Sequence, residues 1–161
     1  MSLKSLLTTK ERDTLNGAVK HELYASNFYL YAASCMQKQG YFGFQAFFDK
    51  EANDEREHYR KLRDIMNDLG EEADMPMIEE VEFENETLDA ILMDAHDMEV
   101  DLLEYYEDAY ETCSVKVKEA MLGFVKTQRK AVGEYKDILA RLALCGEDKA
   151  ARLLLDTEMK G

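Results

Sequence analysis

The segment "NDEREHYRKL", residues 53–62, is the most informative stretch of this sequence, because it places polar residues on an otherwise apolar helical stripe. The stripe advances in steps of three and four residues and comprises Phe48, Glu51, Glu55, His58, Leu62, Ile65 and Leu69. This spacing is typical of one helix face, and the apolar residues at both ends indicate that the face is buried. A buried face with two glutamates and a histidine needs an explanation, since an unpaired charge in a core is costly.

The composition favours an all-α protein. The chain has 161 residues, of which 46% are hydrophobic and 34% charged, with only one proline and eight glycines to interrupt helices. Most other residues are strong helix formers. This length is sufficient for one domain with a sizeable core, so we expect residues 1–161 to form a single domain.

The charge and the cysteines limit the partners and the compartment. A net charge of −14 repels nucleic-acid phosphates, so we expect no nucleic-acid partner. No run approaches the roughly eighteen apolar residues of a membrane span, so we expect no membrane partner. The excess of acid fits plain solubility as well as a surface that attracts cations. Cys35, Cys113 and Cys145 form no CxxC pair, which indicates a reducing, cytoplasmic location.

Helical periodicity predicts a four-helix bundle. The predicted helices run from an N-cap at Thr9 to Gln39, from Tyr41 to Leu69, from a cap at Asn85 or Thr87 to Cys113, and from a cap at Ser114 to Cys145. A short amphipathic fifth helix follows within residues 147–159, with Leu153 and Leu154 on its apolar side. The segment after Gly70 contains Pro76 and has no helical stripe, so we expect a long crossover between the second and third helices.

Each long helix carries polar residues on its inward stripe near mid-length, namely Glu22, Glu55 with His58, Asp97, and Gln128. For the third helix, Asp94 and Glu99 compete with Asp97. Carboxylates and an imidazole at one level require either buried Arg or Lys or a multivalent cation, and no Arg or Lys falls on these stripes. Oxygen and nitrogen ligands without thiolates favour iron, manganese or zinc. A bridging carboxylate can hold two such ions, about 3.5–4 Å apart.

Taken singly, each of these residues has an ordinary explanation. A Glu-x-x-His pair is usually solvated, Glu22 can mark a helix boundary, Tyr29 can belong to the core, and Gln128 can be a buried hydrogen-bonding group. Their joint occurrence on four helices at matching depth is what favours a metal site.

Three motifs, "ELYASNFY" (22–29), "DEREH" (54–58) and "TQRKA" (127–131), resemble the non-haem ferritins, in particular the ferroxidase-active type, and the resemblance covers essentially the whole chain. It implies a ferritin-like bundle in which Glu22, Glu55 and His58 hold a first iron, while Glu55 bridges to a second iron held by Asp97, where the family usually has glutamate. Tyr29 would lie beside this di-iron centre, and Gln128 would hydrogen-bond near the second iron.

The resemblance also implies a function. Fe²⁺ would be oxidised by oxygen or hydrogen peroxide at an intra-subunit ferroxidase centre, and Fe³⁺ would be stored as mineral inside a shell of twenty-four subunits. Asp54 and Glu57 resemble acidic residues that pass iron inward, although a solvated face explains them equally well. Nothing in the sequence identifies a haem ligand. The alternatives are a discrete di-iron oxidase or peroxidase of the rubrerythrin kind, and a shell subunit without an active centre.

Two features depart from the expected pattern. Ferritin-like di-metal bundles can carry Glu-x-x-His on two helices, whereas this chain has one such motif. The two metal positions should therefore be unequal, as suits a site through which ions pass. In addition, Lys116 and Lys118 lie near the start of the fourth helix, where ferritins often have acidic residues that line three-fold channels, so the sequence does not predict an acidic iron entrance there.

Overall fold

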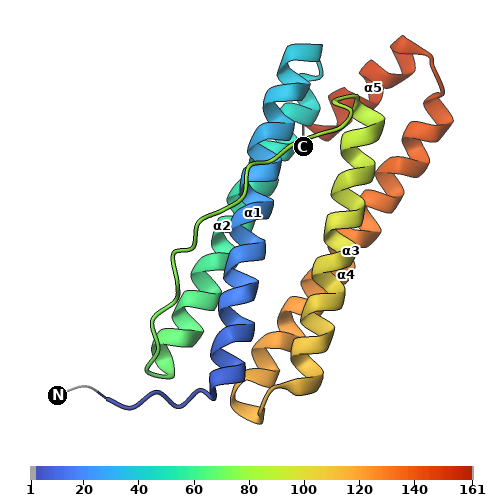
Figure 1. Cartoon of the computed structure of the whole chain (residues 1–161). Coiled ribbons are helices and arrows are strands. Elements are labelled where there is room, and N and C mark those ends of the chain that lie inside the picture. The colour runs from blue at the N-terminus through green and yellow to red at the C-terminus, as the bar shows by residue number, and fades with distance from the viewer. Residues whose placement is uncertain (1–2, 161) are drawn as a thin grey trace.

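The computed structural model describes residues 3–160, and α-helix is the only regular secondary structure in that range. Its helices are α1 (Thr9–Gln39), α2 (Phe42–Asp68), α3 (Leu88–Thr112), α4 (Val115–Cys145) and α5 (Lys149–Met159). Helices α1 and α2 form one antiparallel pair and α3 and α4 form another, while α5 is short and lies at one end of the bundle (Figure 1). The predicted four-helix bundle with a short C-terminal helix is confirmed.

The start of α1 is fixed by a capping box one residue earlier than predicted. The side chain of Thr8, rather than that of Thr9, accepts a hydrogen bond from the Glu11 backbone N–H, and the Glu11 carboxylate accepts one from the Thr8 N–H. The helix ends at Gly40, which has φ 87° and therefore adopts a left-handed conformation that favours glycine. This tight turn makes α1 and α2 antiparallel neighbours.

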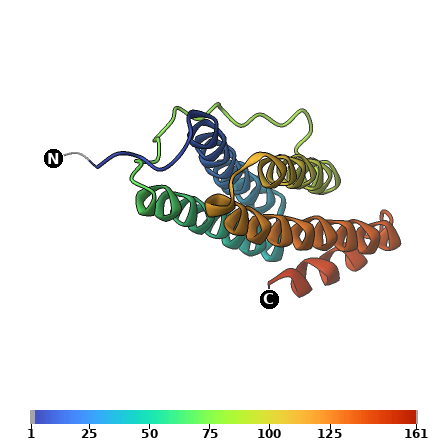
Figure 2. The same cartoon turned by 90° about the horizontal axis from the view of Figure 1, so that it is seen from below.

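The long crossover is confirmed as well. Residues 71–87 contain no helix and run along the length of the bundle from the end of α2 to the start of α3 (Figures 1 and 2). Phe83 anchors this segment by contacting Phe28 edge-on and stacking on Tyr31. Thr87, one of the two expected caps, accepts a hydrogen bond from the Ala90 N–H and begins α3.

Helix α5 completes the start of α2. Tyr41 is the N-cap residue of α2, but its side chain makes no capping hydrogen bond. Instead, the buried carboxylate of Asp156 in α5 accepts hydrogen bonds from the backbone N–H groups of Gly43 (3.0 Å) and Phe44 (2.7 Å). A Cβ atom at Gly43 would lie 1.7 Å from the Asp156 carbonyl oxygen, so this approach requires glycine. Backbone N–H groups at a helix N-terminus have no partner within their own helix, and here Asp156 of α5 accepts hydrogen bonds from two of them and so joins α5 to α2.

The core has two apolar clusters, one in each half of the bundle. The first includes Tyr29 of α1, Phe48 of α2 and Tyr135 of α4, and the second includes Leu62 of α2 and Tyr106 of α3. On each long helix, the sequence interval between the segments that supply these two clusters contains polar residues, namely Glu22, Glu55 with His58, Glu99 and Gln128. The bundle therefore encloses one polar layer between two apolar layers.

Candidate metal centre

Four helices contribute a buried polar side chain to this layer. Glu22 of α1, Glu55 of α2, Glu99 of α3 and Gln128 of α4 have relative exposures of 0%, 3%, 1% and 1%. The inward positions predicted for Glu22, Glu55 and Gln128 are therefore present in the structure. Because isolated ionised carboxylates are costly to bury, this arrangement calls for compensating groups or a cation.

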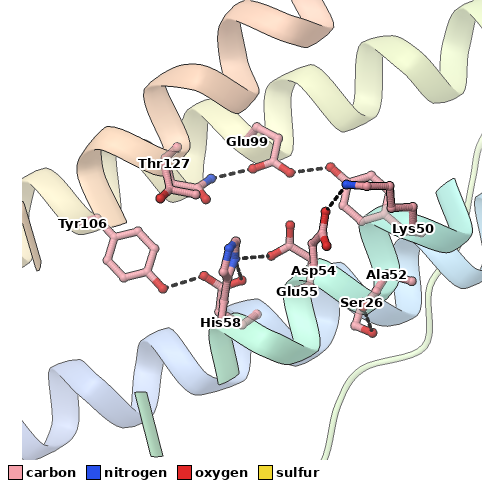
Figure 3. A network of polar contacts seen from close by, with 12 residues as sticks. Ser26, Lys50, Ala52, Asp54, Glu55, His58, Glu99, Tyr106 and Thr127 are labelled. Carbon is pink, nitrogen blue, oxygen red and sulfur yellow. Dashed lines mark hydrogen bonds and ion pairs between the residues drawn. The ribbon is translucent and has the colours of Figure 1, made fainter. Parts of the chain in front are cut away.

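The first group of candidate ligands joins Glu22, Glu55 and His58. One ligand atom from each lies within 4.8 Å of the others. The His58 Nδ1 atom is 3.3 Å from Glu22 Oε2 and 3.2 Å from Glu55 Oε2. Tyr106 donates its hydroxyl hydrogen to Glu22 Oε1 at 2.6 Å, which fixes the orientation of that carboxylate. Figure 3 shows Tyr106, His58 and Glu55 converging on this position.

The second group joins Glu51, Glu55 and Glu99, again with one ligand atom from each within 4.8 Å of the others. Tyr29 donates its hydroxyl hydrogen to one oxygen of Glu99, and the Gln128 amide donates to the other. Figure 3 shows Glu99 on the far side of the layer from Glu55 and His58. Glu55 belongs to both groups and so links them.

The predicted inward position of Asp97 is wrong. Its side chain is 68% exposed, and its carboxylate lies 3.1 Å from the ring of His96. Two residues along an α-helix correspond to a rotation of about 200°, so Asp97 faces outward when Glu99 faces inward. The inward stripe of α3 runs through Ala95, Glu99 and Leu102. Glu99, which the sequence left open as an alternative, therefore occupies the inward position expected for Asp97. This position thus holds a glutamate, the residue that the family usually has there.

Glu51 lies on the predicted inner stripe, but no role was predicted for it. The structure places it half-buried beside Glu55 and Glu99. The available signal was its spacing, because Glu51 lies four residues before Glu55 and hence on the same helix face. Glu51 is thus the third carboxylate of the second group and the fourth of the polar layer.

Burial and mutual repulsion shift the pKa values of this layer. Burial, together with the charge of Glu22, raises the pKa of Glu55 well above its usual value. Burial and nearby carboxylates raise the pKa of Glu99 to about 7 and that of Glu51 to about 8. Burial lowers the pKa of His58, but hydrogen bonds to Glu22 and Glu55 outweigh this effect and raise it to about 10. The layer is therefore short of positive charge.

Within residues 3–160, no Lys or Arg forms an ion pair with these four glutamates, and His58 is their cationic neighbour. A divalent cation can supply the missing charge. Carboxylate oxygens and one imidazole nitrogen suit iron, manganese or zinc, in keeping with the expectation from the sequence.

A groove of about 610 Å³ between α2 and α4 leads to this layer. Glu51, Glu55, His58 and Gln128 are among its lining residues, as are Asp54 and Glu57. Asp54 also pairs with Lys50 at 2.8 Å, and Glu57 pairs with Arg60. Asp54 and Glu57 therefore lie on the same open path as the candidate ligands, with basic neighbours that compete for their charge.

The chain belongs to the ferritin-like family, since residues 12–145 match the family described as "Ferritin-like domain". A probable bacterial non-heme ferritin-like protein of Haemophilus influenzae is 26% identical over 149 residues, which cover 90% of each chain. A bacterial non-heme ferritin of Staphylococcus saprophyticus is 37% identical over 68 residues, which cover 42% of this chain and only 41% of that one.

The fold is also that of solved ferritins. An open pore ferritin from the archaeon Archaeoglobus fulgidus aligns with a TM-score of 0.92 and 25% identity, covering 96% of this chain and 98% of that one. Family membership and these neighbours support a role in iron storage. No helix in residues 3–160 is both long and apolar enough to cross a membrane.

Proposed function

We propose that this chain stores iron by oxidising Fe²⁺ at a two-iron site and depositing Fe³⁺ as mineral inside a multi-subunit shell. The observation that carries the proposal is that Glu55 belongs to both carboxylate groups. One bridging carboxylate can bring two Fe²⁺ ions, which are the substrate, to the short separation typical of two-metal sites.

The two proposed positions are unequal. Glu22, Glu55 and His58 would hold the first ion, whereas Glu55 and Glu99 would hold the second, with Glu51 in reach. Hard carboxylate oxygens favour Fe³⁺ over Fe²⁺ and thereby favour loss of an electron. Two Fe²⁺ ions supply two electrons, and oxygen that accepts them with two protons becomes hydrogen peroxide.

In this proposal Tyr29 and Gln128 assist the second position through Glu99. Both donate a hydrogen bond to it, so neither carboxylate oxygen is free to turn away from the ion. Groups that hold metal ligands in this way commonly tune affinity and reactivity. Asp54 and Glu57, which line the groove and pair with Lys50 and Arg60, would receive Fe³⁺ along it.

Assembly into a shell is part of the proposal. Leu144, Leu153 and Leu154, around the turn into α5 and along it, are 89%, 52% and 64% exposed, and exposed large apolar side chains of this kind favour burial against another copy. We propose that residues 1–161 form one domain and that twenty-four copies close into a shell, with α5 packing against its symmetry mates.

The test is aerobic addition of Fe²⁺ to the purified protein, with absorbance of the Fe³⁺ product and size-exclusion chromatography before and after. The proposal predicts fast oxidation and elution of many irons per chain with a large particle. Oxidation that stops at about two irons on a small species would instead show a discrete di-iron oxidase. An unaltered rate in a Glu55→Ala, His58→Ala variant would show a shell subunit without an active centre.

A further inference from the structure

The hydroxyl of Tyr135 in α4 is buried without a hydrogen-bond partner. Its side chain is 0% exposed, and it is the one buried side-chain N or O atom without a partner in residues 3–160. Buried hydroxyl groups normally have a partner, and leaving one unpaired costs free energy. The two other fully buried tyrosines follow this rule, since Tyr29 donates to Glu99 and Tyr106 donates to Glu22.

Tyr135 packs against Tyr29, whose hydroxyl donates to Glu99, and against Phe47, which lies one helical turn before Glu51 on α2. Its ring is parallel to that of Tyr29, with centroids 6.2 Å apart and an interplanar angle of 4°, and it meets Phe47 edge-on at 5.9 Å. Burial raises the pKa of Tyr135 well above its usual value, and the charges of Glu51 and Glu99 add to that effect, while the nearby Tyr29 hydroxyl, which donates its own hydrogen to Glu99, opposes it. The hydroxyl therefore keeps its proton and remains a donor beside these two carboxylates.

The two carboxylates differ in how they are held. Both oxygens of Glu99 already accept a hydrogen bond, from Tyr29 and Gln128. Within the described part of the chain, no hydrogen bond restrains the half-buried Glu51, which lies at the groove. The Glu51 carboxylate, an acceptor without a hydrogen bond, and the Tyr135 hydroxyl, a donor without a partner, thus occur at the same end of the site.

We propose that Tyr135 is a positioning residue for the second metal position: once a cation draws Glu51 inward, Tyr135 donates its hydroxyl hydrogen to one Glu51 oxygen while the other contacts the ion. This inference rests on the proposed function. It extends to Glu51 the pattern already made by the other two tyrosines, in which a buried hydroxyl orients a metal-facing carboxylate. A hydrogen bond to an ionised carboxylate is strong, and it forms only in the loaded site.

The proposal predicts that loss of the Tyr135 hydroxyl has different effects on the metal-free protein and on the metal-loaded protein. Tyr135→Phe removes an unpaired hydroxyl from the metal-free protein, so that protein should be at least as stable to heat as the wild type. The same change removes a hydrogen bond from the loaded site, so affinity at the second position should fall about 10-fold or more. A hydroxyl with a purely structural role would change stability and leave affinity unaltered.

The test is an anaerobic titration of the full-length protein with Co²⁺, followed by its visible absorption and by calorimetry, together with thermal unfolding in chelator. We expect two sites in the wild type and in Tyr135→Phe, with the affinity of only one site, the second position, lowered in the variant. Tyr105→Phe is the matched control, because its hydroxyl bonds to the Thr14 carbonyl at 2.7 Å, outside the site. In a Glu51→Ala background, Tyr135→Phe should have no further effect.

Wild-type affinity at both sites of Tyr135→Phe would overturn the inference and leave the proposed function intact. A thermal stability of metal-free Tyr135→Phe as low as that of Tyr105→Phe would also overturn it, because the hydroxyl would then have a partner already. Fewer than two Co²⁺ ions bound per wild-type chain would instead overturn the two-ion site itself.

Discussion

His58 Nδ1 lies 3.2 Å from Glu55 Oε2, one turn earlier on α2, so a single helix presents an imidazole and a carboxylate to the same point. Glu22 reaches this point from α1 at 3.3 Å. Glu55 also lies close to Glu99 and Glu51, with one carboxylate oxygen of each residue within 4.8 Å of the others. The account of function depends on this double role of Glu55.

Replacing Glu55 should therefore affect both metal positions. We expect Glu55→Ala to slow the initial rate of Fe²⁺ oxidation by about 100-fold, because each position loses a ligand and the bridge is removed. Stopped-flow absorbance of the Fe³⁺ product measures this rate. Asp97→Asn is the matched control on α3, since Asp97 is exposed and directed away from the layer, and its rate should equal that of the wild type. A slow Asp97→Asn variant would restore Asp97 as a ligand.

Gln128 should act on the second position only. Gln128→Ala leaves one oxygen of Glu99 without its donor, and we expect affinity there to fall about 10-fold while the first position keeps its affinity. Anaerobic Zn²⁺ calorimetry separates the two positions. The adjacent Thr127→Ala is a suitable control, because Thr127 is exposed and its hydroxyl bonds to the Gly123 carbonyl in its own helix. Equal losses at both positions would contradict the assignment.

The stability of the metal-free protein should fall as pH rises. Carboxyl groups with raised pKa values bind more protons in the folded chain than in the unfolded chain, so their contribution is present at low pH. It is lost as pH rises through about 7 for Glu99 and about 8 for Glu51. His58 acts in the same direction, with its contribution lost near pH 10.

A bound cation should reverse this dependence, because it favours the deprotonated ligands. Thermal unfolding between pH 6 and 9, in chelator and in Zn²⁺, provides the comparison. We expect the midpoint in chelator to fall across this range and the increase produced by Zn²⁺ to grow. A Zn²⁺ effect that shrinks toward pH 9 would argue against carboxylate ligands with raised pKa values. Glu55→Ala should remove most of the Zn²⁺ effect.

Helix α5 should depend on Asp156. Asp156→Ala leaves the N–H groups of Gly43 and Phe44 unpaired at the start of α2, and we expect a loss of about 1–3 kcal/mol in the free energy of unfolding. Urea unfolding monitored by circular dichroism measures this loss, and size-exclusion chromatography reports on assembly. Glu147→Gln, at a fully exposed side chain nearby, should change neither result. An equal loss in both variants would contradict the capping role of Asp156.

The helices and the crossover were predictable because periodicity and turn residues are local signals. Glu55 and His58 interrupt an apolar stripe, and such an interruption can be recognised without a structure. The register of α3 was harder, because Asp94, Asp97 and Glu99 are all acidic, and only packing against α1 and α4 decides which one faces inward.

Other contacts depend on residues far apart in the chain. Tyr106 donates to Glu22 across 84 positions, and Asp156 caps α2 across more than a hundred, so no local pattern identifies either partner. The unpaired hydroxyl of Tyr135 is likewise a property of its packed surroundings. These features required the assembled bundle.

The most direct test of the two-ion site is crystallography of the protein soaked anaerobically in Fe²⁺, with anomalous maps recorded at the iron edge. The account predicts two peaks per chain about 3.5–4 Å apart. One should adjoin Glu22 and His58, the other should adjoin Glu99, and Glu55 should lie between them. A single peak, or peaks near Asp97 on the outer face of α3, would contradict it.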